Sequence, residues 1–117
     1  MKENVLKIKS FAFALRSIKC YQYLQQHKNE YVLSKQLLRS GTSIGANIRE
    51  SEHAQSKADF VHKLSIALKE VNETAYWLEL LHQSGYLEEE EFNSIYNECI
   101  ELLKMLTSIV KTSKING

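Results

Sequence analysis

The chain of 117 residues contains no proline, only four glycines and two cysteines. Because proline is absent and glycine is rare, long helices can run without breaks and be joined by short turns. The two cysteines, Cys20 and Cys99, are too few for a disulfide framework or for a four-ligand zinc site. We therefore predict that both are buried free thiols.

Long hydrophobic runs are also missing. The apolar run Phe11–Leu15 near the N-terminus is too short for the hydrophobic region of a secretory signal. No stretch approaches the roughly 18 apolar residues of a membrane span. Hydrophobic residues make up 44% of the chain and charged residues 25%, which is ordinary for a soluble globular protein. We expect a single domain over residues 1–117, located in the cytoplasm and without a membrane partner.

The net charge of +1 conceals an asymmetry along the chain. Residues 1–40 hold eight basic and two acidic residues, a net charge of +6. Residues 41–117 hold seven basic and twelve acidic residues, a net charge of −5. Such a distribution marks either an anion-binding surface or helices that attract each other across a bundle, and the second reading is the simpler one.

Apolar residues recur at spacings of three and four and predict four helices. The first covers about residues 4–27, and the second follows a turn near residues 28–30 and ends near residue 54. A capping box at Ser56–Asp59 opens the third, and Ser84-Gly85 ends it. The acidic run Glu88–Glu91 opens the fourth, where the helix dipole favours carboxylates. Short connections make successive helices antiparallel, so we predict an all-α, antiparallel up-down-up-down four-helix bundle.

The first and third predicted helices carry more apolar surface than one bundle core needs. Apolar residues cover nearly the whole circumference of the first helix, which is typical of a helix buried on more than one side. On the third helix, Ile66, Trp77 and Leu80 form a stripe beside the main apolar seam. Both features predict that the protein binds further copies of itself.

Two glycines lie inside the second predicted helix. Leu37, Gly41, Ile44 and Ile48 keep the helical period, although Gly41 and Gly45 each cost about 1 kcal/mol relative to alanine. A helix that tolerates this cost needs either a bend or a close approach of another backbone. Folding the third helix back onto the second places Gly45 opposite Ser65, so we predict that the close approach is between these two helices.

The same folding rule brings several polar residues together. Arg39 falls within one turn of Glu73, and we predict a partly buried ion pair between them, with Glu70 as a competing partner. A ligand-binding role for this pair is the alternative. We interpret the remaining candidate polar residues as contacts within or between subunits; they are Ser43, Asn47 and Glu50.

Recognisable catalytic or metal-binding motifs are lacking. The chain has no phosphate-binding loop, zinc cysteine cluster or nucleophile elbow. Glu50-x-x-His53 and Glu79-x-x-His82 match the Glu-x-x-His spacing of di-iron bundles, but they lie at levels roughly 40 Å apart along the bundle. We predict no enzymatic activity, no catalytic residues, no metal and no cofactor. In the bundle, Cys20 and Cys99 should be neighbours without being bonded.

The chain resembles the four-helix-bundle family of 23S rRNA intervening-sequence proteins, also called S23 proteins. The residues that carry the resemblance are Ser10-Phe11, Ala14-Leu15, Leu38-Arg39-Ser40, Ser43-Ile44-Gly45-Ala46-Asn47-Ile48, Glu50, Phe60, Leu64, Ala67 and Glu73. The resemblance implies a non-enzymatic bundle that assembles as a ring-like homopentamer. It also implies a loose link with nucleic acid, since some members are encoded inside rRNA genes. The chain departs from the family pattern at Lys69-Glu70, where many relatives have Gly-Ser.

Two functions follow as hypotheses. The first is a homo-oligomeric, pentameric scaffold or interaction protein. The second is an accessory protein that binds RNA or DNA through a basic edge of the first helix; the candidate contacts are Lys2, Lys9, Arg16 and Lys19. Binding of that kind would be repeated around a ring, would depend steeply on salt and would be weakly selective for sequence. The near-neutral net charge favours the scaffold.

Overall fold

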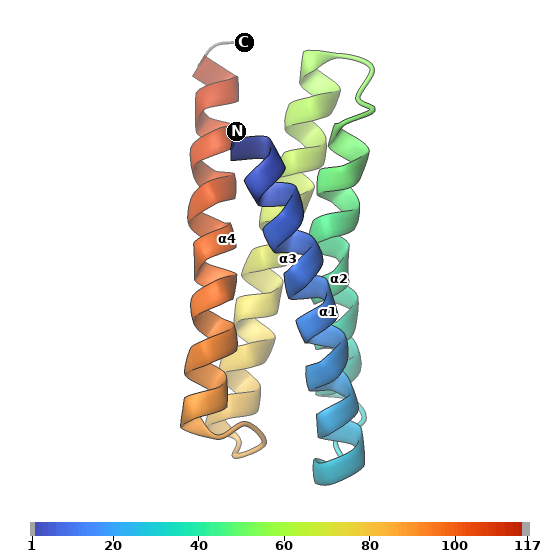
Figure 1. Cartoon of the computed structure of the whole chain (residues 1–117), viewed down its shortest axis with the longest axis vertical. Coiled ribbons are helices and arrows are strands. Elements are labelled where there is room, and N and C mark those ends of the chain that lie inside the picture. Colours follow the sequence, from blue (N-terminus) through green and yellow to red (C-terminus); the bar gives the residue numbers. More distant parts are fainter. Residues whose placement is uncertain (1, 116–117) are drawn as a thin grey trace.

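The computed structural model describes the backbone of residues 2–115 and the side chains of residues 5–115. Four helices make up this part of the chain: α1 (Lys2–Lys28), α2 (Leu33–Ser51), α3 (Lys57–Gln83) and α4 (Glu89–Ile115). Each short connection reverses the direction of the chain, and the helices form an elongated bundle of 46 × 21 × 20 Å (Figure 1). The predicted all-α bundle is confirmed.

Each helix packs against two neighbours. The adjacent pairs are α1–α2, α2–α3, α3–α4 and α1–α4, so α1 and α3 occupy diagonally opposite corners. The core between them is mainly apolar, although the Thr74 hydroxyl donates a buried hydrogen bond to Ser40 at 2.8 Å. Its largest fully buried side chains include Leu6, Phe13 and Leu24 of α1, Leu37 and Ile44 of α2, Leu64 and Leu78 of α3, and Ile95, Leu102 and Leu106 of α4. No helix in the described part of the chain is both long and apolar enough to cross a membrane.

The signals that start and stop α3 work largely as predicted. The Ser56 side chain accepts a hydrogen bond from the backbone N–H of Asp59 at 3.0 Å. The Asp59 carboxylate accepts from the backbone N–H of Gln55 at 3.2 Å, one residue earlier than in a regular capping box. Beyond the other end, Gly85 has a φ of 91°, the left-handed conformation that glycine adopts without strain.

Glu30 organises the turn between α1 and α2. Its buried carboxylate accepts hydrogen bonds from the backbone N–H groups of Val32, Leu33 and Ser34, at 3.1, 2.9 and 2.6 Å. Burial by itself would raise the pKa of Glu30, but these donors outweigh it and lower the pKa below its usual value. The sequence carries no clear signal of this role, because glutamate is not among the preferred N-cap residues.

The close approach predicted at the glycines exists, but its partner is α1 and not α3. A Cβ atom on Gly41 would lie 2.8 Å from Ser17 Cβ, and one on Gly45 would lie 3.4 Å from the carbonyl oxygen of Ser10. Both serines are buried, and their hydroxyls donate to backbone carbonyls of their own helix. The prediction that Gly45 packs opposite Ser65 is therefore wrong. The folding rule located facing levels along two helices but not the side of α2 on which the glycines lie.

Candidate interaction site

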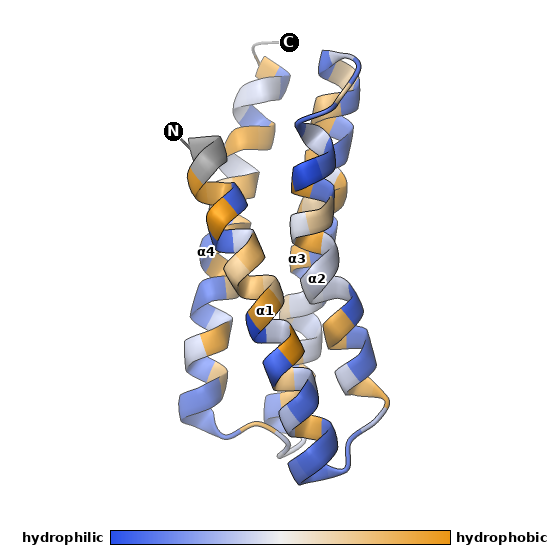
Figure 2. Ribbon diagram, turned by 45° about the vertical axis from the view of Figure 1, so that its right-hand side comes forward, coloured by the Kyte–Doolittle hydropathy of each residue, from blue (hydrophilic) through white to orange (hydrophobic). Residues whose placement is uncertain are grey.

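Helix α1 has two apolar rows on opposite sides. The inner row faces the core and consists of Leu6, Ser10, Phe13, Ser17, Cys20 and Leu24, all of them buried. The opposite side carries Ile8, Phe11, Leu15 and Ile18, which we call the outer row. Figure 2 shows α1 in the foreground, with hydrophobic segments recurring along its length.

The outer row is exposed to solvent in the single chain. Ile8 is 69% exposed, Phe11 53%, Leu15 49% and Ile18 37%. Its spacings of three, four and three residues match those of a coiled-coil seam, in which such side chains pack between the residues of a facing helix. Within the chain, the guanidinium carbon of Arg49 lies 5.8 Å from the centroid of the Phe11 ring, which still leaves about half of Phe11 exposed. An exposed apolar row of this kind is typical of a protein interaction site.

The apolar stripe predicted on α3 is less exposed to solvent than the sequence suggested. Ile66, Trp77 and Leu80 are half-buried, and Trp77 packs against the core. The indole Nε1 of Trp77 is buried and has no hydrogen-bond partner among the residues that the structure describes. Tyr76, the next residue to Trp77, is 56% exposed and lies over a different part of the helix surface. The exposed apolar surface of α3 therefore centres on Tyr76.

Most of the described candidate nucleic-acid contacts are already paired within the chain. Lys9 Nζ lies 2.9 Å from Glu101 Oε2. Arg16 lies 2.6 Å from Glu98 and 3.2 Å from Glu91, and it also donates to Ser94. These pairs link α1 to α4, as expected from helices of opposite charge that attract each other across a bundle. Burial lowers the pKa of Arg16, but the two carboxylates more than offset this and raise it.

The other two candidate contacts differ from Lys9 and Arg16. Lys19 is exposed, and no ion-pair partner for it occurs among the side chains that the structure describes. The side chain of Lys2 lies outside the described residues. Binding of RNA or DNA to this edge stays a prediction, and it would have to displace the carboxylates that hold Lys9 and Arg16.

Arg39 joins α2 to α3 through two carboxylates. Its guanidinium lies 2.5 Å from Glu73 and 3.4 Å from Glu70. The hydrogen bond to Glu73 contributes most to raising the pKa of Arg39. Burial raises the pKa of Glu70, although Arg39 acts in the opposite direction. Half of the Arg39 side chain is exposed, so the group is a surface ion-pair network that contributes little to stability.

The remaining polar candidates have ordinary structural partners. Ser43 donates to the carbonyl of Arg39 at 2.6 Å, and Asn47 donates to the carbonyl of Ser43 at 2.9 Å, so both bonds stay within α2. Glu50 reaches α3 and pairs with Lys63 at 2.9 Å. The contacts of Ser43 and Asn47 therefore stay within one helix, and that of Glu50 joins two helices.

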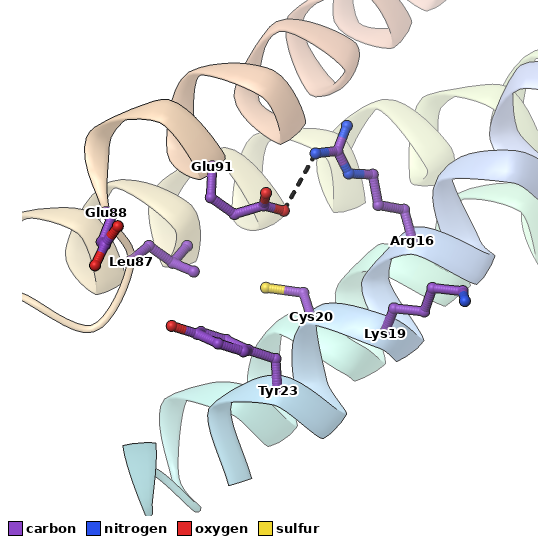
Figure 3. A pocket seen from close by; sticks show the side chains of 7 residues that line it. All are labelled: Arg16, Lys19, Cys20, Tyr23, Leu87, Glu88 and Glu91. Atoms are coloured by element: carbon purple, nitrogen blue, oxygen red, sulfur yellow. Dashed lines mark hydrogen bonds and ion pairs between the residues drawn. The ribbon is translucent and has the colours of Figure 1, made fainter. Parts of the chain in front are cut away.

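A cavity of about 380 Å³ separates α1 from the start of α4. Figure 3 shows Cys20 and Tyr23 on one side of it, Leu87 and Glu91 on the other, and the Arg16–Glu91 pair at its edge. Burial raises the pKa of the Cys20 thiol to about 12, with a further contribution from Glu91. A thiol of this kind is protonated and unreactive at neutral pH. The cavity had no signal in the sequence, because it depends on the distance between two helices.

Cys99 is the second thiol, and it has a different environment. Both cysteines are free and buried, as predicted. Cys99 Sγ lies 3.6 Å from the carbonyl oxygen of Val71, and burial raises its pKa to about 12. That the two sulfurs are neighbours stays a prediction.

In the second Glu-x-x-His motif, both side chains contact aromatic residues of α4. Glu79 accepts a hydrogen bond from the hydroxyl of Tyr96 at 2.7 Å, and the ring of His82 stacks on Phe92 with the centroids 4.2 Å apart. Among the residues that the structure describes, no three histidine, cysteine, aspartate or glutamate side chains are grouped as a metal site would require.

Fold and surface together define a class of small helical bundles with an apolar surface row. The chain belongs to the family of 23S rRNA-intervening sequence proteins, whose model matches residues 2–108. It is similar to a protein of unknown function from the S23 ribosomal protein family of Bacteroides thetaiotaomicron, known from a crystal structure. The two share 58% sequence identity and a TM-score of 0.93, over 95% of this chain and 99% of the other. No curated protein matches the chain.

Proposed function

We propose that the protein is a non-enzymatic scaffold that assembles from copies of itself through the outer row of α1. The exposure of Ile8, Phe11, Leu15 and Ile18 is the observation that carries this proposal. Full burial of an aliphatic or aromatic side chain of this size contributes about 1.5–3 kcal/mol. Four such side chains provide a sizeable part of what is needed to offset the loss of translational and rotational freedom on association.

A homopentamer is the assembly that we propose. Its support is the resemblance to the intervening-sequence proteins, which the match over residues 2–108 strengthens. In a ring, each copy of α1 would be buried on both sides, which accounts for a helix that is apolar almost all round. RNA or DNA binding is the weaker alternative, because Lys9 and Arg16 already have carboxylate partners.

The mass of the particle in solution tests the proposal. We expect multi-angle light scattering at micromolar concentration to give a mass five times that of the 13.5 kDa subunit. Replacing two exposed members of the row, in the variant Ile8→Lys/Leu15→Lys, should give a folded monomer, because charges would then be buried at the interface.

A matched variant controls for the added charge. Asn93→Lys/Asn97→Lys places two lysines on exposed positions of α4 and should leave the mass of the particle unchanged. Circular dichroism should show the same helix content for both variants. A wild-type protein that scatters as a 13.5 kDa monomer would refute the scaffold.

A further inference from the structure

The cavity between α1 and the start of α4 has a mainly apolar inner wall. Cys20 and Leu87 both line it, although only 7% and 2% of these residues are exposed. The ring of Tyr23 lines it nearer to solvent and is 37% exposed. A thiol, an isobutyl group and an aromatic ring together offer a polarisable and mainly apolar surface. Cavities of this composition between the helices of a bundle are typical sites for small ligands.

The thiol of Cys20 points into this space without a hydrogen-bond partner. Figure 3 shows its sulfur directed away from α1, toward the gap between Tyr23, Leu87 and Glu91. Among the residues that the structure describes, a thiol hydrogen bond is found for Cys99 and none for Cys20. A buried donor that is unpaired in the single chain is a position where a bound molecule can supply the missing contact.

The charged groups that line the cavity offset one another. Arg16 and Lys19 contribute two positive charges, and Glu88 and Glu91 contribute two negative charges. Arg16 and Glu91 pair directly at 3.2 Å, and Lys19 extends away from the other lining side chains (Figure 3). A charged ligand would have to break this ion pair or leave its own charge uncompensated, which is costly beside an apolar wall. The lining therefore favours an uncharged molecule.

One carboxylate oxygen is available to orient such a molecule. The ion pair with Arg16 uses Oε1 of Glu91, and no hydrogen bond to Oε2 of Glu91 occurs among the described residues. This carboxylate extends from α4 toward α1 (Figure 3). Carboxylate oxygens accept strong hydrogen bonds from N–H and O–H donors. The cavity therefore combines an apolar wall with a single acceptor at its edge.

From these features we infer that the cavity binds a small uncharged aromatic molecule with one N–H or O–H donor, such as an indole or a phenol. The donor binds the carboxylate of Glu91, and the rings pack between Tyr23 and Leu87 against the Cys20 thiol. An apolar cavity of about 150 Å³ accommodates benzene, so a cavity of about 380 Å³ has room for two fused rings. The site goes beyond the proposed function, because it lies within one chain and needs no second copy.

Isothermal titration calorimetry with indole tests the site, whether the protein is a single chain or an assembly. We expect saturable binding of one indole per subunit. 1-Methylindole has the same rings but no N–H donor, and we expect it to bind about tenfold more weakly, because the hydrogen bond to a charged group is lost. Glu91→Ala should weaken the binding of indole by a similar factor and should remove the difference between the two ligands.

A matched variant controls for the loss of a carboxylate. Glu98→Ala removes the other partner of Arg16, which does not line the cavity, and should leave both affinities unchanged. Glu91 and Glu98 are both about half exposed, so both variants should fold, which circular dichroism checks. The inference is wrong if indole shows no saturable binding to wild type, or if indole and 1-methylindole bind equally well. It is also wrong if Glu91→Ala binds indole as tightly as wild type does, because the ligand then lies elsewhere.

Discussion

Helix α1 meets its two neighbours in different ways. Against α2 it presents the small residues Ser10 and Ser17, which lie directly over Gly45 and Gly41. Against α4 it presents Lys9, which pairs with Glu101, and Arg16, which pairs with Glu98 and, at the edge of a cavity of about 380 Å³, with Glu91. The first contact depends on close packing and tolerates little change, while the second spans a wider gap with flexible charged groups. We therefore expect the contact with α2 to contribute more to the stability of α1 in the bundle than the contact with α4.

The strongest test of the contact with α2 is Gly41→Ala. The added Cβ would lie 2.8 Å from Ser17 Cβ, which is closer than packed atoms allow, so the helices must separate. We expect a loss of about 1–3 kcal/mol of unfolding free energy, typical of overpacking, measured by urea denaturation at fixed protein concentration. Gly45→Ala is the control: its Cβ would lie 3.4 Å from the nearest atom, and the gain of about 1 kcal/mol in helix propensity should offset the strain. Equal losses for the two variants would contradict the comparison.

Glu30→Gln tests the turn that leads from α1 into α2. The variant keeps one acceptor oxygen but loses the charge that attracts three backbone N–H groups. Hydrogen bonds to charged groups contribute about 1.5–3 kcal/mol, and we expect a loss of about 1–2 kcal/mol at pH 7, since part of the bonding survives.

The pH dependence of this loss has a definite sign. The pKa of Glu30 is lowered in the folded protein, so its contribution is fully present above the unfolded pKa of about 4.3. It is lost as the pH falls through the lower, folded pKa. The difference between wild type and Glu30→Gln should therefore shrink when urea denaturation is repeated at about pH 3, and a difference that stayed constant would exclude the charge as its cause.

Arg16→Gln should have the smallest effect of the three and should depend on salt. Its partners Glu91 and Glu98 are about half exposed, so solvent screens the pairs, and we expect a loss of less than about 1 kcal/mol. The loss should decrease further in 1 M salt, where the screening length falls to about 3 Å. Lys9→Gln, which removes one more exposed pair, should lose even less. A loss for Arg16→Gln as large as that for Gly41→Ala would overturn the ranking of the two contacts.

The polar pairs show how far the sequence could predict the candidate site. A folding rule that needs only helix length and a short turn predicted that Arg39 lies near Glu73 and Glu70. In the structure, the Arg39 guanidinium lies 2.5 Å from Glu73 and 3.4 Å from Glu70. The exposed side of α1 was predictable as well, because apolar residues cover more of its circumference than one core can bury. The partners of Lys9 and Arg16 were not, since the sequence allowed both a free basic edge and pairing with α4.

The number of helices, their approximate ends and their antiparallel order could all be predicted from the sequence. These follow from local physics: the apolar period, the hydroxyl of Ser56, the conformational freedom of Gly85 and the short connections. Three features could not be predicted in this way: the helix that covers Gly41, the carboxylates that pair with Arg16, and the position of the cavity beside Cys20. These depend on the rotation of each helix about its axis and on the distance between axes. Both are set by packing of the whole core, and no single segment of the chain encodes them.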